Sequence, residues 1–327
     1  MSEMTEERDF EEQDPADQDM VLAIATSPTF ERDGLCFAAR HSGLYRSTDG
    51  GRTFELTYGS LNLQTELPTL AVAVSPQFAT DHTLFAGAEG GILRSFDAGQ
   101  TWFVELLPAP PPVISAMLVS PGYEEDGTVF AATLEDGVYR SASRGGHWEL
   151  WNFRLLDLHV LSLAISPSFK QDETLFVGTE SGLFRSTNGG RAWRELAFAA
   201  ESAPVLGLAV SPAYAQNGTV YAGTEPAGVW RSVDRGTSWE RLSEGLIGDL
   251  IAGPVNAVLA ASEADLLVLL EDAVLVSHDS GATWVACDGG EALEAGASCI
   301  AAPQGLAPGA PLLVGLGDGT VATLAAA

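Results

Sequence analysis

One short motif, Ser-x-Asp-x-Gly-x-Thr-Trp, occurs six times along the 327 residues, and its spacing is nearly constant. The copies begin at Ser47, Ser95, Ser141, Ser186, Ser232 and Ser277, which lie 48, 46, 45, 46 and 45 residues apart. A fixed period in this range indicates an array of similar supersecondary units packed side by side. The chain is therefore expected to fold as a single repeat domain.

Each copy of the motif has the composition of a tight turn. Its Asp or Asn side chain can accept hydrogen bonds from the backbone amides of the turn, and its glycine can adopt the positive φ that the turn needs. The predicted structural acceptors are Asp49, Asp97, Asn188, Asp234 and Asp279. The third copy departs from the pattern, because Ser143 and His147 stand in place of Asp and Thr. His147 is interpreted as a turn residue.

These copies resemble the Asp-box (BNR) repeat of β-propellers, known from sialidases, sortilin-type receptors and photosystem II assembly factors. The resemblance covers most of the chain and implies a propeller fold. It also implies that the motif lies on the rim, away from active sites, so it carries little information about function. In such propellers the loops between the second and third strands share the opposite face with the links between blades.

The residues around each motif repeat as well. In five units an apolar strand ends in Ser-Pro, an aromatic residue follows two positions later, and Asp or Asn follows three positions after that. A second strand, a third strand, the motif and a fourth strand complete the unit, and four strands at this period predict a propeller blade. We therefore predict an all-β, seven-bladed propeller of four-stranded antiparallel blades. The blades are expected at approximately 20–60, 68–107, 113–152, 159–198, 204–244, 254–288 and 296–327.

The last unit has three predicted strands and no motif, which would leave an exposed sheet edge. Residues 8–11, Arg-Asp-Phe-Glu, are similar to residues 52–55, Arg-Thr-Phe-Glu, where a fourth strand begins. We expect residues near 6–12 to complete the seventh blade, with Phe10 in the place of the motif's aromatic residue. The alternative is that residues 1–19, which carry nine acidic residues, form a disordered tail.

The net charge of −28 restricts the partners of the chain. Phosphate backbones and anionic membrane surfaces would repel it at long range, so nucleic acid binding is not predicted. No apolar run approaches the ~18 residues of a membrane span, so membrane insertion is not predicted either. The acidity indicates either solubility or a basic partner. The N-terminus has neither the basic nor the apolar region of a signal peptide. The three cysteines lack a CxxC spacing, and Cys36 is interpreted as a small buried residue at the place of Phe85. These features favour a cytoplasmic location.

One group of polar residues occupies equivalent positions in the loops between the predicted second and third strands. Its members are His41, Glu89, Glu135, Glu180, Glu225, Glu271 and Asp318. They would form an acidic ring around one mouth of the central channel. The ring would bind a Lys/Arg-rich segment of another protein or capture a cation, and we favour the basic segment because the carboxylates would be too far apart to hold one ion. Alternatively, they are exposed turn residues of the repeat.

A second candidate site is the link between the third and fourth blades, where Trp151, Phe153, Arg154 and Leu155 occur close together. An exposed apolar run of this kind would be a protein-binding patch. Packing between adjacent blades is the alternative.

The sequence gives little support to an enzyme. A sialidase needs three arginines that converge on a substrate carboxylate, whereas Arg46, Arg94, Arg140, Arg185 and Arg231 all precede the motif serine and cannot converge. No catalytic residue, metal site or cofactor is predicted. We expect a non-catalytic scaffold, or a subunit or assembly factor of a multiprotein complex. The alternative is a glycan-binding or sialidase-like glycoside hydrolase propeller.

Overall fold

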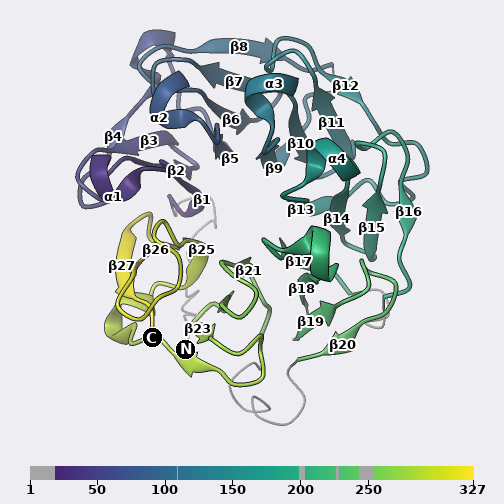
Figure 1. Ribbon diagram of the computed structural model, residues 1–327. Helices are drawn as coiled ribbons and strands as arrows, with labels where there is room; N and C mark the ends of the chain where they lie inside the picture. Colours follow the sequence, from purple (N-terminus) through teal and green to yellow (C-terminus); the bar gives the residue numbers. More distant parts are fainter. Residues whose placement is uncertain (1–18, 109, 199–202, 226–227, 243–252) are drawn as a thin grey trace, which may run out of the picture.

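The computed structural model describes residues 19–108, 110–198, 203–225, 228–242 and 253–327. Within these residues, seven small antiparallel sheets form a closed ring, as predicted for a seven-bladed β-propeller (Figure 1). Blade 1 consists of β1 (Val21–Thr26), β2 (Cys36–Arg40), β3 (Gly43–Ser47) and β4 (Glu55–Leu56). Blade 2 consists of β5 (Thr69–Val74), β6 (Leu84–Ala88), β7 (Gly91–Ser95) and β8 (Phe103–Leu106). Blade 3 consists of β9 (Ile114–Val119), β10 (Val129–Thr133), β11 (Val138–Ser141) and β12 (Glu149–Leu150).

Blades 4 and 5 are β13 (Val160–Ile165), β14 (Leu175–Thr179), β15 (Leu183–Ser186), β16 (Arg194–Glu195) and β17 (Val205–Val210), β18 (Val220–Thr224), β19 (Val229–Ser232), β20 (Glu240–Arg241). Blade 6 is β21 (Ala257–Ala260), β22 (Leu266–Leu269), β23 (Val274–Ser277), β24 (Val285–Ala286), and blade 7 is β25 (Ala297–Ala301), β26 (Pro311–Leu316), β27 (Val321–Ala325). The first strands of adjacent blades contact each other at six of the seven junctions, and at the junction of blades 6 and 7 the contact is between β22 and β25. The first strands therefore surround the channel, and later strands lie progressively outward. Two short 3-10 helices, η2 (Tyr58–Leu61) and η3 (Gly290–Leu293), occur in links between blades.

Each Ser-Pro loop folds into a four-residue helix at the end of the first strand. The helices are α1 (Phe30–Asp33), α2 (Phe78–Asp81), α3 (Tyr123–Asp126), α4 (Phe169–Asp172) and α5 (Tyr214–Asn217). The loop serine donates its hydroxyl to the aspartate that ends the helix, as Ser75 does to Asp81 at 2.6 Å and Ser120 to Asp126 at 2.6 Å. The Ser-Pro-aromatic-Asp pattern therefore closes its own loop through a local side-chain hydrogen bond.

The aromatic residue that begins each helix fastens its blade to the one before it. Four of these rings meet a second-strand ring of the preceding blade edge to face, with centroids 5.7 to 6.0 Å apart. The pairs are Phe37–Phe78, Phe85–Tyr123, Phe130–Phe169 and Phe176–Tyr214. Edge-to-face pairs add about 0.5–1.5 kcal/mol to the free energy gained by burying their surface. The repeated loop thus joins blades as well as closing itself.

In the repeated turns between the third and fourth strands, the motif serine is the central group. The Ser232 hydroxyl donates to Asp234 at 2.8 Å and accepts from the Gly236 amide at 2.8 Å. Asp234 in turn accepts from the Thr237 and Ser238 amides and from the Ser238 hydroxyl. The turn glycine has positive φ in all six copies, as predicted, with φ of 84° at Gly236. Asn188, which replaces the aspartate, keeps the acceptor role, because its Oδ1 accepts from the Ser186 hydroxyl and the Ala192 amide, each at 2.9 Å. Ala192 has no hydroxyl, so the second side-chain bond of the turns with aspartate is absent here.

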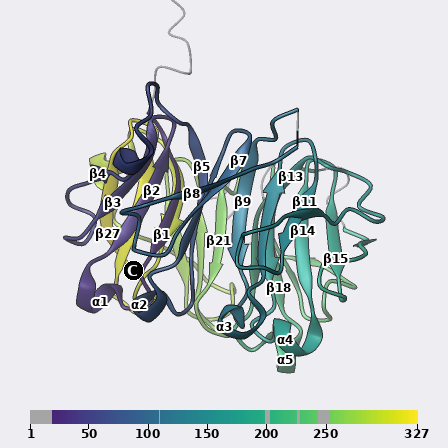
Figure 2. The ribbon, with the colours of Figure 1, turned by 90° about the horizontal axis from the view of Figure 1, so that it is seen from above.

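These turns lie against the helices of the same blade. The amide of the residue before the turn glycine donates to the residue that caps the helix, as Arg144 does to the Gly127 carbonyl at 3.0 Å and Arg235 to Gly218 at 2.9 Å. Both partners adopt positive φ, even where one is arginine. This contact holds the Ser-Pro loops and the repeated turns on one face, which we call the helix face (Figure 2).

The arginines before the motif serine bridge neighbouring blades. Arg94 donates to the Arg144 carbonyl at 3.2 Å, Arg231 donates to the Ser280 carbonyl at 2.9 Å, and Arg185 makes the same contact to Arg235. Each acceptor belongs to the repeated turn of the next blade. These three arginines therefore bind backbone and do not converge on the channel.

The alignment of Cys36 with Phe85 was wrong by one position. Cys36 pairs with Ser47 as Leu84 pairs with Ser95, so Cys36 takes the place of a leucine and Phe37 that of Phe85. The side chain is nevertheless fully buried, and burial raises the pKa of its thiol to about 12.

Blade 7 has three strands within the described residues, and β27 lies at its outer edge. The predicted closing strand near residues 6–12 lies outside the described residues. The described chain begins at Asp19, and a Cβ on Gly319, in the turn before β27, would lie 2.5 Å from the Asp19 carbonyl oxygen. The chain therefore enters the ring next to blade 7.

We expect Asp234→Asn to reduce the loss of stability in acid. Hydrogen bonds from Ser238 and Ser232 lower the pKa of Asp234 to about 2. A lowered carboxyl pKa stabilises the fold above the unfolded value of about 3.9, and this contribution disappears as the pH falls toward 2. Thermal melts at pH 2, 3, 4 and 7 should therefore show a shallower fall in Tm for the variant. Asn188→Gln, in a turn without the carboxylate, is the control, and an identical acid profile for Asp234→Asn and wild type would contradict the prediction.

Deletion of residues 1–13 should lower the melting temperature by many degrees, because it removes the segment predicted to pair with β27. Deletion of residues 1–5, which keeps Arg8 to Glu11, should leave the melt close to that of wild type. Differential scanning calorimetry of both variants measures the effect. An unchanged melt for the longer deletion would mean that the acidic segment does not contribute to the fold.

Candidate functional site

All seven residues of the predicted ring lie in the loops between the second and third strands of their blades. The loops connect β2 to β3 (His41), β6 to β7 (Glu89), β10 to β11 (Glu135), β14 to β15 (Glu180), β18 to β19 (Glu225), β22 to β23 (Glu271) and β26 to β27 (Asp318). These loops lie opposite the helices α1 to α5, which gather at one side of the disc in Figure 2. We call this side the loop face.

Backbone hydrogen bonds attach these loops to the inner strands. The Glu180 amide donates to the His159 carbonyl at 3.2 Å, and the Glu225 amide donates to Pro204 at 3.0 Å. The Ala297 amide donates to the Glu271 carbonyl at 2.6 Å. His159, Pro204 and Ala297 lie at the beginnings of first strands, which surround the channel. The ring residues therefore lie one strand outward from the channel wall, at the end where the inner strands begin.

The six carboxylates of the ring are exposed, and His41 is half-buried. None of the six carboxylates forms an ion pair with another described residue. In the described part of the chain there is also no group of three or more His, Cys, Asp or Glu side chains that could hold a metal ion. The arrangement presents separated negative charges, which suits a ligand with several positive charges better than a single cation.

Asp318 also has a structural role in its loop. Its carboxylate accepts hydrogen bonds from the Thr320 amide at 2.9 Å and the Thr320 hydroxyl at 2.7 Å. These bonds lower the pKa of Asp318, so it is charged throughout the neutral range. At this position, the interpretation as a turn residue and the interpretation as part of a charged ring apply together.

Two further carboxylates on the loop face were not predicted. Asp19 precedes β1 and accepts from the Ser42 amide at 2.9 Å and hydroxyl at 2.8 Å. Asp157 precedes β13 and accepts from the Ser181 amide at 2.9 Å and hydroxyl at 2.6 Å. Burial opposes ionisation of Asp157, but these bonds and the His159 amide lower its pKa overall. The sequence feature that could have indicated these two carboxylates is the serine that follows the ring residue, in His41-Ser42 and Glu180-Ser181.

The linking loop between blades 3 and 4 divides into exposed and buried residues. Phe153 is 70% exposed and Arg154 is exposed, whereas Leu155 is 6% exposed and packs in the core. The inclusion of Leu155 in a binding patch was therefore wrong, because its side chain cannot reach a partner. Leu156, which follows it, is 75% exposed. The exposed apolar pair is thus Phe153 and Leu156.

Trp151 is half-buried beneath two cations. The Arg140 guanidinium lies 4.1 Å from its ring centroid, and that of Arg191 lies 5.4 Å away. The Trp151 carbonyl also accepts from the Trp193 indole at 2.7 Å. These contacts place Trp151 in the junction between blades 3 and 4, which leaves less of its ring available to a ligand.

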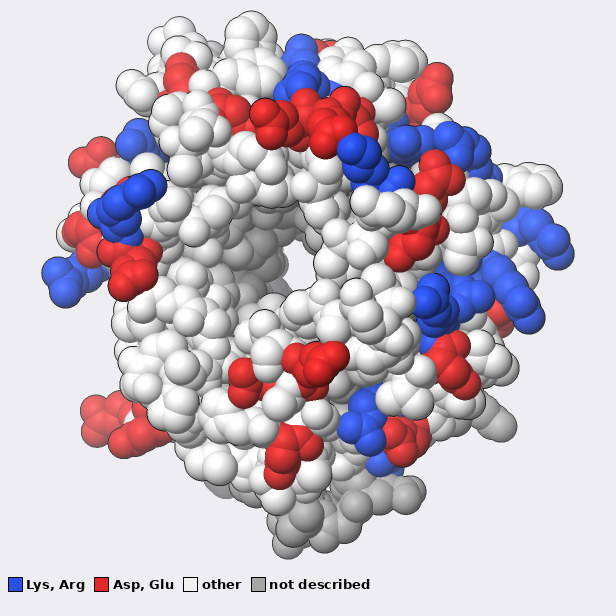
Figure 3. Space-filling view, in the orientation of Figure 1, with Lys and Arg blue, Asp and Glu red and all other residues white. Residues whose placement is uncertain are grey.

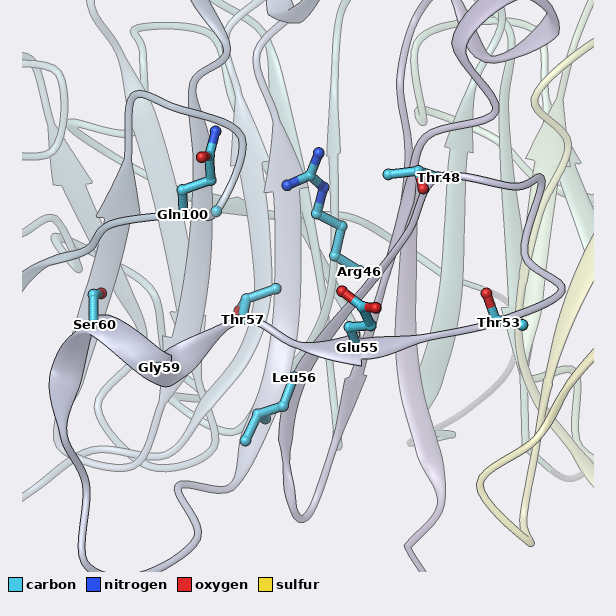
Figure 4. Close-up of a pocket in the computed structure, with 10 residues that line it drawn as sticks. Arg46, Thr48, Thr53, Glu55, Leu56, Thr57, Gly59, Ser60 and Gln100 are labelled. Carbon is cyan, nitrogen blue, oxygen red and sulfur yellow. The ribbon is translucent and has the colours of Figure 1, made fainter.

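Four of the surface cavities formed by described residues have volumes of about 380, 460, 510 and 510 Å³, and all four are lined by residues outside the acidic ring. The 460 Å³ cavity lies between the outer part of blade 1 and the repeated turn of blade 2. In Figure 4, Arg46 extends away from Glu55 into the space between Thr48 and Gln100. Each cavity is lined by a single carboxylate residue: Glu55, Glu66, Glu195 or Glu31. None therefore offers the carboxylate pair that most glycoside hydrolases use.

The charge of the chain is distributed unevenly around the ring. Residues 140–241, which span blades 4 and 5 and the end of blade 3, contain ten of the sixteen Lys and Arg residues but ten of the 44 Asp and Glu residues. Figure 3, which shows the helix face and the open channel, has its largest gathering of basic side chains on the right, over these blades. The excess negative charge therefore belongs to the other blades and the N-terminal segment.

No helix among the described residues has the length and apolar character needed to cross a membrane. No family model matches the chain, and no curated protein matches it in sequence. Solved structures do match. A structure of YCF48 bound to D1 peptide has a TM-score of 0.70 at 16% identity, over 95% of this chain and 94% of that one. YCF48 from Cyanidioschyzon merolae has a TM-score of 0.66 at 12% identity, over 94% and 95% of the two chains.

Glycoside hydrolases of the GH74 family are also similar in fold. An ancestral GH74 enzyme has a TM-score of 0.71 at 18% identity, over 95% of this chain and 45% of that one. The GH74 xyloglucanase from Xanthomonas campestris has a TM-score of 0.69 at 16% identity, over 92% and 51% of the two chains. This chain spans about half the length of these enzymes. At such identities the comparisons establish the propeller fold and leave the function to the residues of the site.

Proposed function

We propose that this chain is a non-catalytic scaffold that binds a Lys/Arg-rich segment of another protein on its loop face. The observation that carries the proposal is the position of six exposed carboxylates, without ion-pair partners among the described residues, at equivalent points around one end of the channel. A rigid ring of like charges stays charged without internal compensation, so a basic ligand can supply the missing partners.

The propeller supplies rigidity and the loops supply recognition. The helix face uses its polar groups to close turns and join blades, so few of them remain for a ligand. The loop face carries the ring. The exposed Phe153 and Leu156 lie beside the repeated turn and outer strand of blade 4, and we propose them as a secondary apolar contact. A similar fold, YCF48, has been solved with a peptide bound, which supports peptide binding as a use of this architecture. We further propose a cytoplasmic role as a subunit or assembly factor of a multiprotein complex.

The alternative is a glycan-binding or glycoside hydrolase propeller, and the similarity to GH74 enzymes favours it. The cavities weigh against hydrolysis, because each contains one carboxylate residue. A carbohydrate array with the wild-type protein addresses this alternative directly, since retention of a defined oligosaccharide would favour it.

Exchange of the ring glutamates Glu89, Glu135, Glu180 and Glu225 for glutamine should weaken binding of a ten-residue oligolysine peptide at least tenfold at low salt. Loss of four charges removes favourable Coulomb energy, and wild-type affinity should fall steeply with salt because exposed charges are screened. Fluorescence anisotropy at increasing sodium chloride concentrations measures both effects. Recovery of a protein partner from lysate of the native host by wild type, and its loss in the variant, would extend the result to the natural ligand.

The matched control exchanges four exposed glutamates that lie away from the loop face or on the outer edge: Glu31, Glu124, Glu195 and Glu263. This variant has the same net charge as the ring variant. Equal weakening in both variants would show that the overall charge, and not the ring, attracts the peptide.

A further inference from the structure

The fourth strand of blade 2 is longer than the other described fourth strands. β8 has four residues, whereas β4, β12, β16, β20 and β24 have two each. It pairs with β7 on one side, and no other described strand pairs with its second side. A sheet edge of this length presents free backbone donors and acceptors to solvent.

The hydrogen-bond alternation identifies which backbone groups are free. The Leu107 amide donates to the Gly90 carbonyl at 3.0 Å, so Gly90 and Leu107 occupy the register of a hydrogen-bonded pair, and the Gly90 amide donates instead to the Pro112 carbonyl at 2.9 Å. In an antiparallel ladder such pairs alternate with non-bonded ones. The register pairs Leu93 with Val104 and Gly91 with Leu106, which are therefore the non-bonded pairs. The amide and carbonyl groups of Val104 and Leu106 consequently point outward from β8.

The same strand lacks the charges that usually protect an edge. Phe103, Val104 and Leu106 are 54%, 48% and 82% exposed, and Phe96, whose ring centroid lies 5.8 Å from that of Phe103, is 42% exposed. Four of the eleven exposed large apolar side chains of the described residues thus occur at this edge. Its one charged residue, Glu105, is paired with Arg94 at 2.9 Å. By contrast, β16 and β20 each consist of one acidic and one basic residue.

The surrounding charge selects the kind of partner. The Leu106 end of β8 pairs with Gly91, two residues after the exposed Glu89, which forms no ion pair with another described residue. A second copy of this chain would bring another net charge of −28 to the edge, which opposes self-association. A segment with basic residues would instead be attracted, and its apolar residues would cover Phe103, Val104 and Leu106.

We propose that β8 binds an extended segment of another protein, in which apolar and basic residues alternate, as a fifth strand of blade 2. Main-chain hydrogen bonds to Val104 and Leu106 hold the segment, and side-chain contacts select its sequence, as in other cases of strand addition. Pro108, two residues after β8, cannot donate to a ladder, so the added strand is expected to be short. This site goes beyond the acidic ring, because it recognises backbone on the rim of the disc.

Val104→Pro tests the proposal because it removes an outward amide and leaves the bonds between β7 and β8 in place. The probe is an acetylated and amidated hexapeptide of alternating lysine and valine. For wild type, we expect this peptide to slow hydrogen exchange at the Val104 and Leu106 amides at least tenfold. Val104→Pro should weaken peptide binding by a similar factor. Leu150→Pro is the matched control, since Leu150 has the same outward register in β12 and is 51% exposed.

A second variant covers the case in which proline disturbs the blade. Val104→Lys keeps the amide but adds a charge that repels the peptide, so it should also weaken binding while its melting temperature stays close to that of wild type. A variant with Glu135, Glu180 and Glu225 exchanged for glutamine, which retains Glu89, should still show protection at Val104. Failure of the ring proposal and failure of this one are therefore distinguishable.

Several results would overturn the proposal. Equal peptide binding by Val104→Pro and wild type would exclude strand addition at β8, as would peptide binding without slower exchange at Val104 and Leu106. Loss of the Val104 protection in the triple glutamine variant would assign the peptide to the acidic ring. A concentration-dependent dimer in sedimentation experiments, with the same amides protected in the absence of peptide, would show that a second copy occupies the edge.

Discussion

The edge-to-face contact between an aromatic ring at the start of a short helix and a phenylalanine of the preceding blade is the interaction on which the ring depends. It occurs at four successive junctions, from Phe37–Phe78 to Phe176–Tyr214. Each of these helical rings is positioned by a loop that a side-chain hydrogen bond closes, from Ser to Asp in three loops and from Asn217 to Ser211 in the fourth. A local hydrogen bond therefore determines a contact between blades. At the junction between blade 7 and blade 1, Phe30 packs with Cys36 and Leu313. Leu313 of β26 there takes the place of the phenylalanine, so the described residues of this junction form no aromatic pair.

This division of roles explains why the two faces differ. The helix face contains the aromatic pairs, the serine-centred turns and the arginines that bridge blades, and substitution of any of these would loosen the ring. On the loop face, backbone bonds attach several loops to the inner strands, and the side chains of Asp19, Asp157 and Asp318 hold three loops in addition. Ring residues attached only through their backbone, such as Glu180 and Glu225, are therefore able to vary for recognition at little cost in stability.

Much of the fold was predictable because the repeat reveals equivalence. Six copies of the turn and five of the Ser-Pro loop defined the blades, the glycines with positive φ and the ring of acidic loops. Contacts between blades were not predictable in the same way. Arg94 reaches Arg144 and Trp193 reaches Trp151, and no spacing within one repeat indicates which residue of the neighbouring blade lies opposite. Asp19 and Asp157 were missed because they occur in two links and do not recur in every blade.

Side-chain direction in irregular links was the other limit. Leu155 and Leu156 are identical residues next to each other, yet one is buried and the other is 75% exposed. Strands and helices have a period that assigns each residue to a face, but a link has none. The edge of β8 was overlooked for a related reason, since the sequence of the motif does not show how far a fourth strand continues.

Charge is distributed unevenly among the blades: residues 20–60 (blade 1) and 159–198 (blade 4) each carry four acidic and four basic residues, whereas residues 68–107 (blade 2) carry four acidic and one basic, and residues 254–288 (blade 6) carry six acidic and none basic. Such a molecule experiences a torque in the field of a charged partner and turns before the two surfaces touch. A cationic partner would be attracted to the more acidic blades, and blade 2 is more acidic than blades 1 and 4. The order of the blades along the chain therefore influences how a partner is oriented when it meets the disc, and hence the fraction of collisions that lead to a complex.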